Sequence, residues 1–189
     1  MKRLFDVLSS VLVMIIIMPI ALIICVLIKA ESKGPIFYKQ KRNGKNMKAF
    51  MMYKFRSMKL HDETTYVQTE VNDPRITKIG KFLRKTSLDE LPQLINIIRG
   101  EMSVVGPRPH ALEIDNKYCS KFPNYKKRYT VRPGLTGLAQ INGFRGGDDF
   151  ESMKKRTEFD LVYMSKNSLI GDLIIIFKTI PSLFIKGIY

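Results

Sequence analysis

Cysteine and histidine are scarce in this chain of 189 residues. Cys25 lies in an apolar run and Cys119 lies far along the sequence, so the two predict no disulfide framework and lack the spacing of a zinc site. His61 and His110 are likewise too few to hold a metal. A fold built around disulfides or zinc is therefore excluded, and the length fits one domain with a core of modest size.

Acidic residues are absent from positions 32–61, although the whole chain carries 17 of them. The basic residues of that stretch are Lys33, Lys39, Lys41, Arg42, Lys45, Lys48, Lys54, Arg56 and Lys59. The formal net charge of the chain is +15, which indicates an anionic partner such as nucleic acid, anionic lipid or a phosphorylated substrate. A basic run is also typical of a solvated or membrane-facing surface, and composition alone does not choose among these.

A long apolar run occupies residues 7–28, where Ser9 and Ser10 are the polar exceptions. As a helix this run is long enough to cross the roughly 30 Å hydrocarbon core of a bilayer. It is too long for the apolar part of a cleaved signal peptide, and no small-residue cleavage site follows it. We therefore expect a membrane helix within residues 1–33 and a separate domain over residues 34–189.

Pro19 falls in the middle of the apolar run, where it removes a backbone hydrogen bond and favours a kink. Basic residues stand at both ends, with Lys2 and Arg3 before the run and Lys29 and Lys33 after it, so the positive-inside rule gives no clear orientation. A bent helix that enters and leaves by one face, with a cytoplasmic N-terminus, and a straight spanning helix both fit the sequence.

Beyond the membrane helix, the patterns predict a mainly helical α+β domain. Residues 36–40 and 47–53 alternate as short strands do, and Asn43-Gly44 predicts the turn of a hairpin between them. Asp73-Pro74 predicts the entrance of a helix that ends at Arg84. The residues that share one face of this helix are Ile76, Ile79, Phe82 and Leu83.

A second helix is predicted to end at Gly100. Its expected buried stripe is Leu88, Leu91, Ile95 and Ile98. The C-terminal residues 169–189 are apolar but interrupted. The interrupting residues are Asp172, Lys178, Pro181 and Lys186. We expect interfacial helices that lie on the membrane here, rather than a second span.

Asp89 and Glu90 form a carboxylate pair just inside a predicted helix start. One interpretation is a capping box, in which Ser87 and Glu90 satisfy each other's backbone amides. The other is a functional pair, because the stripe places Asp89 on the exposed side and Glu90 at its flank. Pro92 prefers the first position of a helix, which leaves the acids in a tight turn at a positive helix end. That position favours an ionised Asp89, which can attack phosphorus as carboxylate nucleophiles do.

Guanidinium groups surround this pair in the sequence, at Arg56, Arg84, Arg108 and Arg132. A transferring phosphoryl group needs its charge neutralised by Mg²⁺ and by Arg or Lys. Glu90 suits a hard metal that is bound by oxygen. Two acids among guanidinium groups therefore predict a site for a metal-bound diphosphate.

At this point the residues resemble the bacterial sugar transferases, also called monotopic phosphoglycosyl transferases. The resemblance covers most of the chain. The matching segments are residues 2–6, 34–35, 40, 54–58, 73–76, 83–94, 102–109, 132–143 and 160–163. It implies transfer of a sugar 1-phosphate from a UDP-sugar to undecaprenyl phosphate with release of UMP. It also implies a place in the bacterial inner membrane, with the catalytic domain on the cytoplasmic face.

Carried over residue by residue, the resemblance implies that Asp89 is the nucleophile that captures the phosphosugar. Glu90 beside it becomes a Mg²⁺ ligand, and the magnesium site is Asp89 and Glu90. Pro19 becomes the breakpoint of a re-entrant helix, although Met18 stands where the family commonly has Ser. Arg108, within Gly-Pro-Arg-Pro, becomes the expected phosphate contact, with a surface Arg in a stiff turn as the alternative.

Further substrate-binding candidates follow from the basic residues and from acidic positions that match the family. The basic ones are Lys54, Arg56, Arg84, Arg132 and Arg145. Lys54, Arg56 and Arg132 have lipid phosphates as an alternative partner. Asp160 and Asp172 are the acidic candidates. Asp160 is alternatively a helix-surface charge, and Asp172 is alternatively the N-cap of the apolar segment that follows.

The sugar is indicated by residues 140–147 and the basic and acidic residues after them, which resemble the undecaprenyl-phosphate glucose phosphotransferase branch. UDP-glucose is therefore the expected donor, ahead of UDP-galactose or an N-acetylated UDP-sugar. Anionic membrane lipid is a further expected partner. Nucleic acid is not expected as a partner. Self-association into a homo-oligomer stays open. The alternative from another class is a non-catalytic, membrane-anchored binding module, which leaves the carboxylate pair without a purpose.

Overall fold

The structure is a computed structural model that describes residues 1–60, 73–146 and 149–182. Its elements in chain order are α1 (Lys2–Glu31), β1 (Phe37–Asn43), η1 (Lys45–Met47), β2 (Ala49–Phe55), α2 (Lys78–Thr86), η2 (Leu88–Glu90), α3 (Gln93–Arg99), β3 (Ser103–Val105), α4 (Leu112–Tyr118), η3 (Tyr125–Thr130), β4 (Gly134–Thr136), α5 (Leu138–Ile141), α6 (Phe150–Ser165) and α7 (Leu169–Ser182), where η marks a 3₁₀ helix. The predicted mainly helical α+β fold is confirmed.

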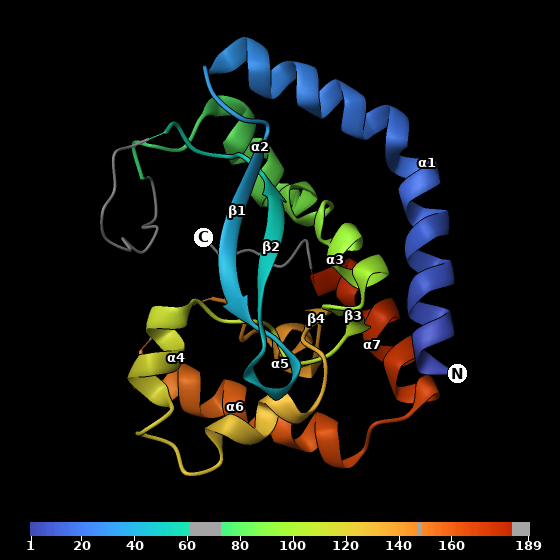
Figure 1. Ribbon diagram of the computed structural model, residues 1–189, viewed down its shortest axis with the longest axis vertical. Helices are drawn as coiled ribbons and strands as arrows, with labels where there is room; N and C mark the ends of the chain where they lie inside the picture. The colour runs from blue at the N-terminus through green and yellow to red at the C-terminus, as the bar shows by residue number, and fades with distance from the viewer. Residues whose placement is uncertain (61–72, 147–148, 183–189) are drawn as a thin grey trace.

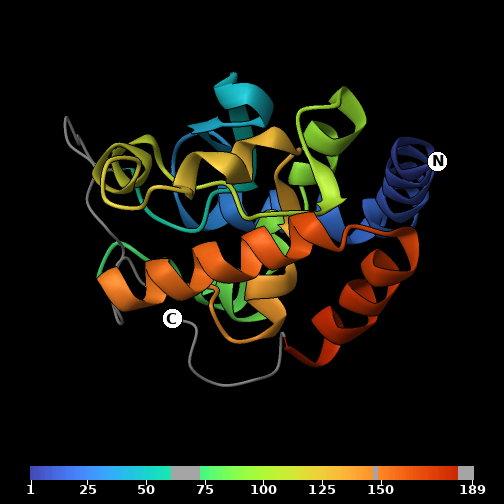
Figure 2. The same cartoon turned by 90° about the horizontal axis from the view of Figure 1, so that it is seen from below.

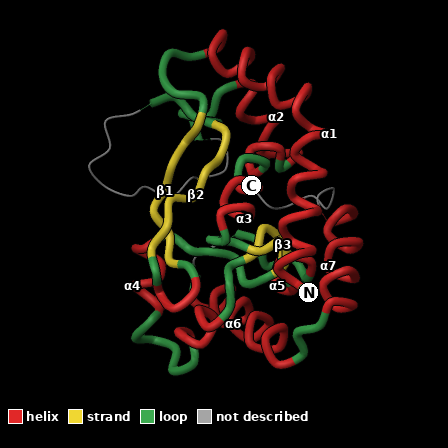
Figure 3. The backbone as a smooth tube through the Cα atoms, turned by 45° about the vertical axis from the view of Figure 1, so that its right-hand side comes forward, coloured by secondary structure: helices red, strands yellow, loops and turns green. Residues whose placement is uncertain are grey.

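Helix α1 is 30 residues long, and Pro19 lies inside it. In the part of the chain that the structure describes, it is the one helix long and apolar enough to cross a membrane, and 11% of its most apolar window is buried. Figure 1 shows the ribbon of α1 change direction between its two halves, as the tube in Figure 3 also does. The apolar surface of α1 is therefore exposed along most of its length.

Polar side chains fasten both ends of α1 to the rest of the molecule. Near its start, the Asp6 carboxylate accepts hydrogen bonds from the Ser103 hydroxyl (2.8 Å) and the Val104 amide (3.1 Å). At its end, the Glu31 carboxylate accepts from the amides of Lys78 (2.6 Å) and Ile79 (2.9 Å), which open α2. These bonds fix the long apolar helix against the polar domain.

The predicted hairpin is present, but its strands are longer and its turn is wider than expected. Strands β1 and β2 are antiparallel from Phe37 opposite Phe55 to Asn43 opposite Ala49. The connection spans residues 44–48 and contains η1, so Asn43-Gly44 is not a two-residue turn. Asn46 and Met47 both have positive φ there, which bends the chain back within a short distance.

Helix α2 begins later than predicted, at Lys78, because the Thr77 side chain caps it by accepting from the Gly80 amide. Leu83 is buried as expected, whereas Phe82 is 52% exposed and does not share the buried face. The stripe predicted for the next helix is also wrong. Its most buried members are Gln93, Leu94, Asn96 and Ile97, while Ile95 and Ile98 are half-buried. Helix α3 lies between β2 and α1, so it needs two buried sides rather than one apolar stripe.

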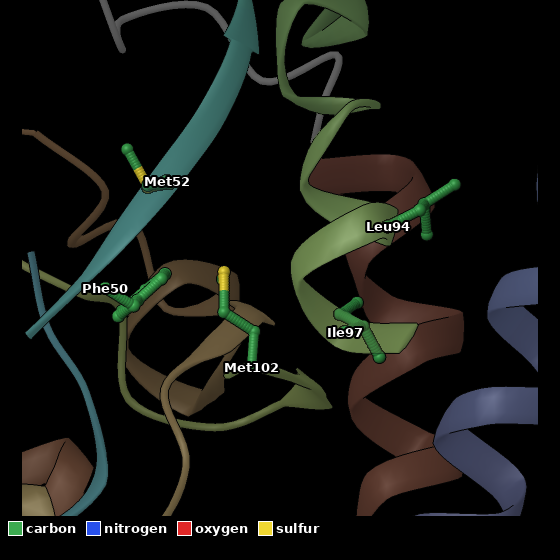
Figure 4. Close-up of a cluster of buried hydrophobic side chains, with 5 residues drawn as sticks. All are labelled: Phe50, Met52, Leu94, Ile97 and Met102. Atoms are coloured by element: carbon green, nitrogen blue, oxygen red, sulfur yellow. The ribbon is translucent and has the colours of Figure 1, made fainter. Parts of the chain in front are cut away.

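The core beside α3 draws on segments far apart in the sequence. Figure 4 shows Phe50 and Met52 of β2, Leu94 and Ile97 of α3, and Met102 just before β3. Met14 and Ile17 of α1 pack against this cluster, which ties the long apolar helix to the core.

Strands β3 and β4 form a short parallel pair, with Ser103 opposite Gly134 and Val105 opposite Thr136. A Cβ atom at position 134 would lie 2.1 Å from the backbone nitrogen of Gly106, so this close approach requires glycine. The pair matters for the site because the chain that leaves β3 runs directly into Pro107 and Arg108.

Helix α7 lies beside the first half of α1, as Figures 2 and 3 both show. Its outward side chains include Ile170 and Phe177, which are 73% and 72% exposed. The predicted apolar C-terminal helix is confirmed as far as Ser182, and residues 183–189 lie outside the described part. Helices α1 and α7 thus present two exposed apolar surfaces near each other.

Candidate active site

Asp89 and Glu90 lie in η2, a single 3₁₀ turn between α2 and α3. Helix α2 ends at Thr86, and Ser87 reverses the chain with a left-handed conformation at φ 56°. Pro92 lacks an amide hydrogen and precedes the regular helix, which begins at Gln93. The prediction that the acids occupy a tight turn before the regular helix is confirmed.

The capping-box interpretation is wrong. The Glu90 amide bonds to the backbone carbonyl of Ser87 at 3.2 Å, and the Ser87 side chain makes no cap hydrogen bond. The Glu90 carboxylate is directed instead at two cations from distant segments. The chain therefore uses Glu90 to assemble a charged cluster rather than to cap the start of a helix.

Glu90 accepts hydrogen bonds from both neighbouring cations. Lys54 Nζ lies 2.8 Å from Glu90 Oε1, and Arg108 binds bidentately, through Nη1 to Oε2 at 3.1 Å and through Nη2 to Oε1. Burial alone would raise the pKa of Glu90, but Arg108 and Lys54 outweigh it and hold that pKa well below its usual value. Glu90 is therefore ionised at neutral pH and holds the two cations in place.

Asp89 is 3% exposed, so the expectation that it lies on the exposed side is wrong. Its Oδ2 lies 3.9 Å from Lys54 Nζ, and its Oδ1 is buried and has no hydrogen-bond partner within the part of the chain that the structure describes. Burial raises the pKa of Asp89, Lys54 opposes that shift, and the Glu90 charge adds to it. The surroundings therefore shift the pKa values of the two acids in opposite directions. Glu90 is held as an ion, whereas Asp89 has a raised pKa and an Oδ1 with no hydrogen-bond partner among the described residues.

Replacing Lys54 with methionine should move the acid side of the pH–rate profile to higher pH. Lys54 favours the ionised form of Asp89, so its loss raises the Asp89 pKa further, and an activity that needs the carboxylate begins at higher pH. The profile of kcat/KM against pH measures this. Lys48→Met, at an exposed position in the hairpin connection, is the matched control and should leave the acid side unchanged. An unmoved profile in Lys54→Met would contradict the coupling.

The structure brings some of the predicted cations to the dyad and places others elsewhere. Lys54 and Arg108 contact Glu90, and Arg84 lies close enough to lower the Asp89 pKa while its Nε bonds Ser57 Oγ at 3.1 Å. The side chains of Lys54 and Arg108 are 19% and 21% exposed, so these two cations lie between the buried acids and solvent.

Arg56 and Arg132 are held by backbone carbonyls away from the dyad. Arg56 donates to the carbonyls of Lys33 (2.6 Å) and Ser32 (2.7 Å) and so closes the end of α1. Arg132 donates to the Gly100 carbonyl at 2.8 Å. Arg132 also lines a cavity of about 170 Å³ beside the start of α1, together with Lys2, Arg3 and Lys45.

Asp160 is buried in an ion pair with Arg128, a residue that the sequence analysis missed. Arg128 donates to Asp160 Oδ2 at 2.8 Å and also to the backbone carbonyl of Arg108 at 2.6 Å. The interpretation of Asp160 as a helix-surface charge is wrong, because it is 1% exposed. Asp160 thus supports the segment that carries Arg108. No spacing in the sequence predicted a pair whose members are 32 residues apart.

Asp172 and Arg145 lie in other parts of the molecule. Asp172 binds Lys2 of α1 and accepts from the Tyr163 hydroxyl at 2.9 Å, inside the first turn of α7 rather than at its N-cap. It therefore joins α7 to the start of α1. Arg145 is half-buried in the segment between α5 and α6, and its role stays a prediction.

Oxygen donors for a divalent cation are present at the dyad. The described residues contain no cluster of three or more His, Cys, Asp or Glu side chains that would hold a metal alone. Magnesium, however, is commonly bound through one or two carboxylates plus substrate phosphates. The buried Oδ1 of Asp89, for which residues 1–60, 73–146 and 149–182 supply no hydrogen-bond partner, fits such a ligand, and Glu90 already accepts from two cations.

A buried acid whose Oδ1 has no hydrogen-bond partner among the described residues, with Lys and Arg beside it, is an arrangement typical of a site for a phosphate-bearing substrate. The sequence profile of the family described as bacterial sugar transferase matches residues 1–186. The chain belongs to the bacterial sugar transferase family.

Three relatives are informative. A UDP-glucose:undecaprenyl-phosphate glucose-1-phosphate transferase of Klebsiella pneumoniae is 50% identical over 98% of this chain and 40% of its own length. The exopolysaccharide production protein PSS of Rhizobium leguminosarum is 46% identical over 99% of this chain and 96% of its own length. A UDP-N-acetylgalactosamine-undecaprenyl-phosphate N-acetylgalactosaminephosphotransferase of Aeromonas hydrophila is 39% identical over 96% of this chain and 43% of its own length. The chain thus spans about two fifths of the length of two of these three relatives.

Proposed function

We propose that this protein transfers a hexose 1-phosphate from a UDP-sugar to undecaprenyl phosphate, with release of UMP. The observation that carries the proposal is the Oδ1 of Asp89, a buried carboxylate oxygen that has no partner among the described residues and lies beside Lys54 and Arg108. The names of the relatives from Klebsiella pneumoniae and Aeromonas hydrophila support undecaprenyl phosphate as the acceptor and a UDP-sugar as the donor.

The proposed reaction has two displacements at one phosphorus. Asp89 attacks the β-phosphorus of the UDP-sugar, the bond to the bridging oxygen breaks, and UMP leaves with that oxygen. The phosphate of undecaprenyl phosphate then attacks the same phosphorus and releases the Asp89 carboxylate. Lys54 and Arg108, which Glu90 holds beside Asp89, offset the negative charge that gathers there. Mg²⁺ bound at Asp89 and the diphosphate would neutralise further charge.

UDP-glucose is the proposed donor. The relative from Klebsiella pneumoniae is named for glucose, which agrees with the resemblance of residues 140–147 to the glucose branch. The relative from Aeromonas hydrophila is named for an N-acetylated sugar, so UDP-galactose and N-acetylated UDP-sugars are the alternatives for the same reaction.

UMP release from purified protein tests the function. With UDP-glucose, undecaprenyl phosphate and Mg²⁺ we expect UMP, and chelation by EDTA should abolish it until Mg²⁺ is restored. Parallel reactions with UDP-galactose and UDP-N-acetylgalactosamine rank the donors. The absence of UMP with every donor would favour the non-catalytic binding module instead. Full turnover in excess EDTA, with metal removal verified, would contradict the magnesium site alone.

We place the protein in the bacterial inner membrane, with α1 bent at Pro19 so that both of its ends face the cytoplasm. Support comes from the exposed apolar surface of α1 and from the polar anchors that join both of its ends to one domain. The exposed side of α7 would lie on the same bilayer surface. The basic cavity lined by Lys2, Arg3, Lys45 and Arg132 is a suitable place for the phosphate of an anionic lipid.

Cysteine labelling in intact cells tests this topology. Leu4→Cys and Lys33→Cys, one near each end of α1, are introduced separately after Cys25 and Cys119 are replaced by serine. Neither should react with a membrane-impermeant thiol reagent from the periplasm, and both should react once the membrane is permeabilised. Periplasmic labelling of Leu4→Cys alone would show that α1 spans the membrane.

A further inference from the structure

Gln93, the first residue of α3, has a buried side chain whose polar atoms are both unsatisfied. It is 1% exposed, and neither its Nε2 nor its Oε1 has a hydrogen-bond partner among the described residues. A buried amide without partners destabilises a fold, and proteins rarely keep one without a reason. Gln93 follows Asp89 by four residues, and Asp89 carries another unsatisfied buried oxygen.

The local backbone directs Gln93 toward the same strand as Glu90. The Leu94 amide bonds the Leu91 carbonyl at 3.0 Å and the Ile95 amide bonds the Pro92 carbonyl at 3.1 Å, so this turn has the 3₁₀ pattern, in which residues three apart are aligned. Glu90 and Gln93 are three apart. Gln93 therefore lies one turn, about 6 Å, along the axis from Glu90.

Asn96, three residues after Gln93, also faces β2. Its side chain accepts from the Tyr53 amide at 3.1 Å and donates to the Met51 carbonyl at 2.7 Å, and both belong to β2. Glu90 binds Lys54 of the same strand. Gln93 lies in sequence between two residues that both reach β2, which favours a position for its amide in the layer between α3 and β2, on the side of the dyad.

We propose that Gln93 is a binding residue for the diphosphate of the donor and its hydrated divalent cation, an inference that rests on the proposed function. An amide needs both an acceptor for Nε2 and a donor for Oε1. Phosphate oxygens accept, and water bound to the cation donates. One ligand with both groups satisfies Gln93 and, through the cation, the free Oδ1 of Asp89. Asn96 has its partners in the protein and needs no ligand.

The test uses Gln93→Met, which keeps the length of the side chain and removes both polar atoms, in the full chain in detergent or nanodiscs. Without ligand, its thermal midpoint should equal or exceed that of the wild type, because an unsatisfied amide is replaced by an apolar group. Asn96→Leu is the matched control on the same helix and should lower the midpoint, because it breaks satisfied buried bonds. The affinity for UDP with Mg²⁺, measured by calorimetry below both midpoints, should fall about tenfold in Gln93→Met.

An unchanged affinity of folded Gln93→Met for UDP with Mg²⁺ would overturn the inference, whatever its midpoint. The proposed function is tested separately by the wild type. If the wild type binds UDP and releases UMP while Gln93→Met binds equally well, the function stands and the role of Gln93 fails. If the wild type neither binds UDP nor releases UMP, the function itself fails, and the role of Gln93 fails with it.

Discussion

Asp89→Asn should reduce UMP release by about a thousandfold or more, because an amide oxygen is a poor nucleophile toward phosphorus. The substitution is almost isosteric and leaves Lys54, Arg108 and Glu90 in place, so the charged surroundings of the site persist. The rate of UMP release with UDP-glucose and undecaprenyl phosphate measures the effect. Near-normal turnover in Asp89→Asn would remove Asp89 from the mechanism.

The stability of Asp89→Asn separates chemistry from folding. Burial raises the pKa of Asp89, so the folded state disfavours its ionised form, and a neutral asparagine avoids that cost at neutral pH. We therefore expect a thermal midpoint at or above that of the wild type. A variant that is inactive and also clearly less stable would leave lost structure as the cause of its inactivity.

Asp160→Ala should destabilise the protein by about 3–5 kcal/mol, because it leaves the Arg128 guanidinium buried without its carboxylate. The side chains of Arg128 and Asp160 are 1% and 2% exposed. Chemical denaturation measures the free energy of unfolding. UMP release should also fall, because Arg128 bonds the carbonyl of Arg108 and thereby positions the arginine that contacts Glu90.

A matched control for Asp160→Ala lies on the same helix. Glu158 pairs with Lys155 at 3.5 Å, but their side chains are 50% and 55% exposed. Glu158→Ala should therefore change the free energy of unfolding by no more than about 0.5 kcal/mol. Equal stabilities of Asp160→Ala and Glu158→Ala would contradict a structural role for the buried pair.

The sequence was sufficient for features that depend on local order. The apolar run predicted α1, alternation predicted β1 and β2, and Pro92 predicted that the regular helix starts after the acids. The sequence also identified Asp89 and Glu90 as a candidate functional pair. These signals come from neighbouring residues, whose spacing and backbone preferences act within one or two turns.

The sequence was insufficient where distant segments meet. Lys54 and Glu90 are 36 residues apart, and Arg108 and Glu90 are 18 apart, so no local pattern shows that these cations displace the capping box. The Arg128–Asp160 pair was missed for the same reason, because its members are far apart in the sequence. Arg56 and Arg132 were predicted near the dyad, but their partners are backbone carbonyls in other segments. The predicted stripe of α3 failed because two buried polar residues, Gln93 and Asn96, occupy its inner side. Burial assigned from hydrophobicity alone overlooks such residues.

The central claim is that Asp89 carries the phosphosugar between donor and acceptor, and intact mass measured without acceptor tests it most directly. Wild-type protein mixed with UDP-glucose and Mg²⁺ alone should release about one UMP per active site and gain the mass of a hexose phosphate on Asp89. Asp89→Asn should do neither. If the wild type shows no mass gain and no UMP until undecaprenyl phosphate is added, the transfer is direct and the claim is wrong.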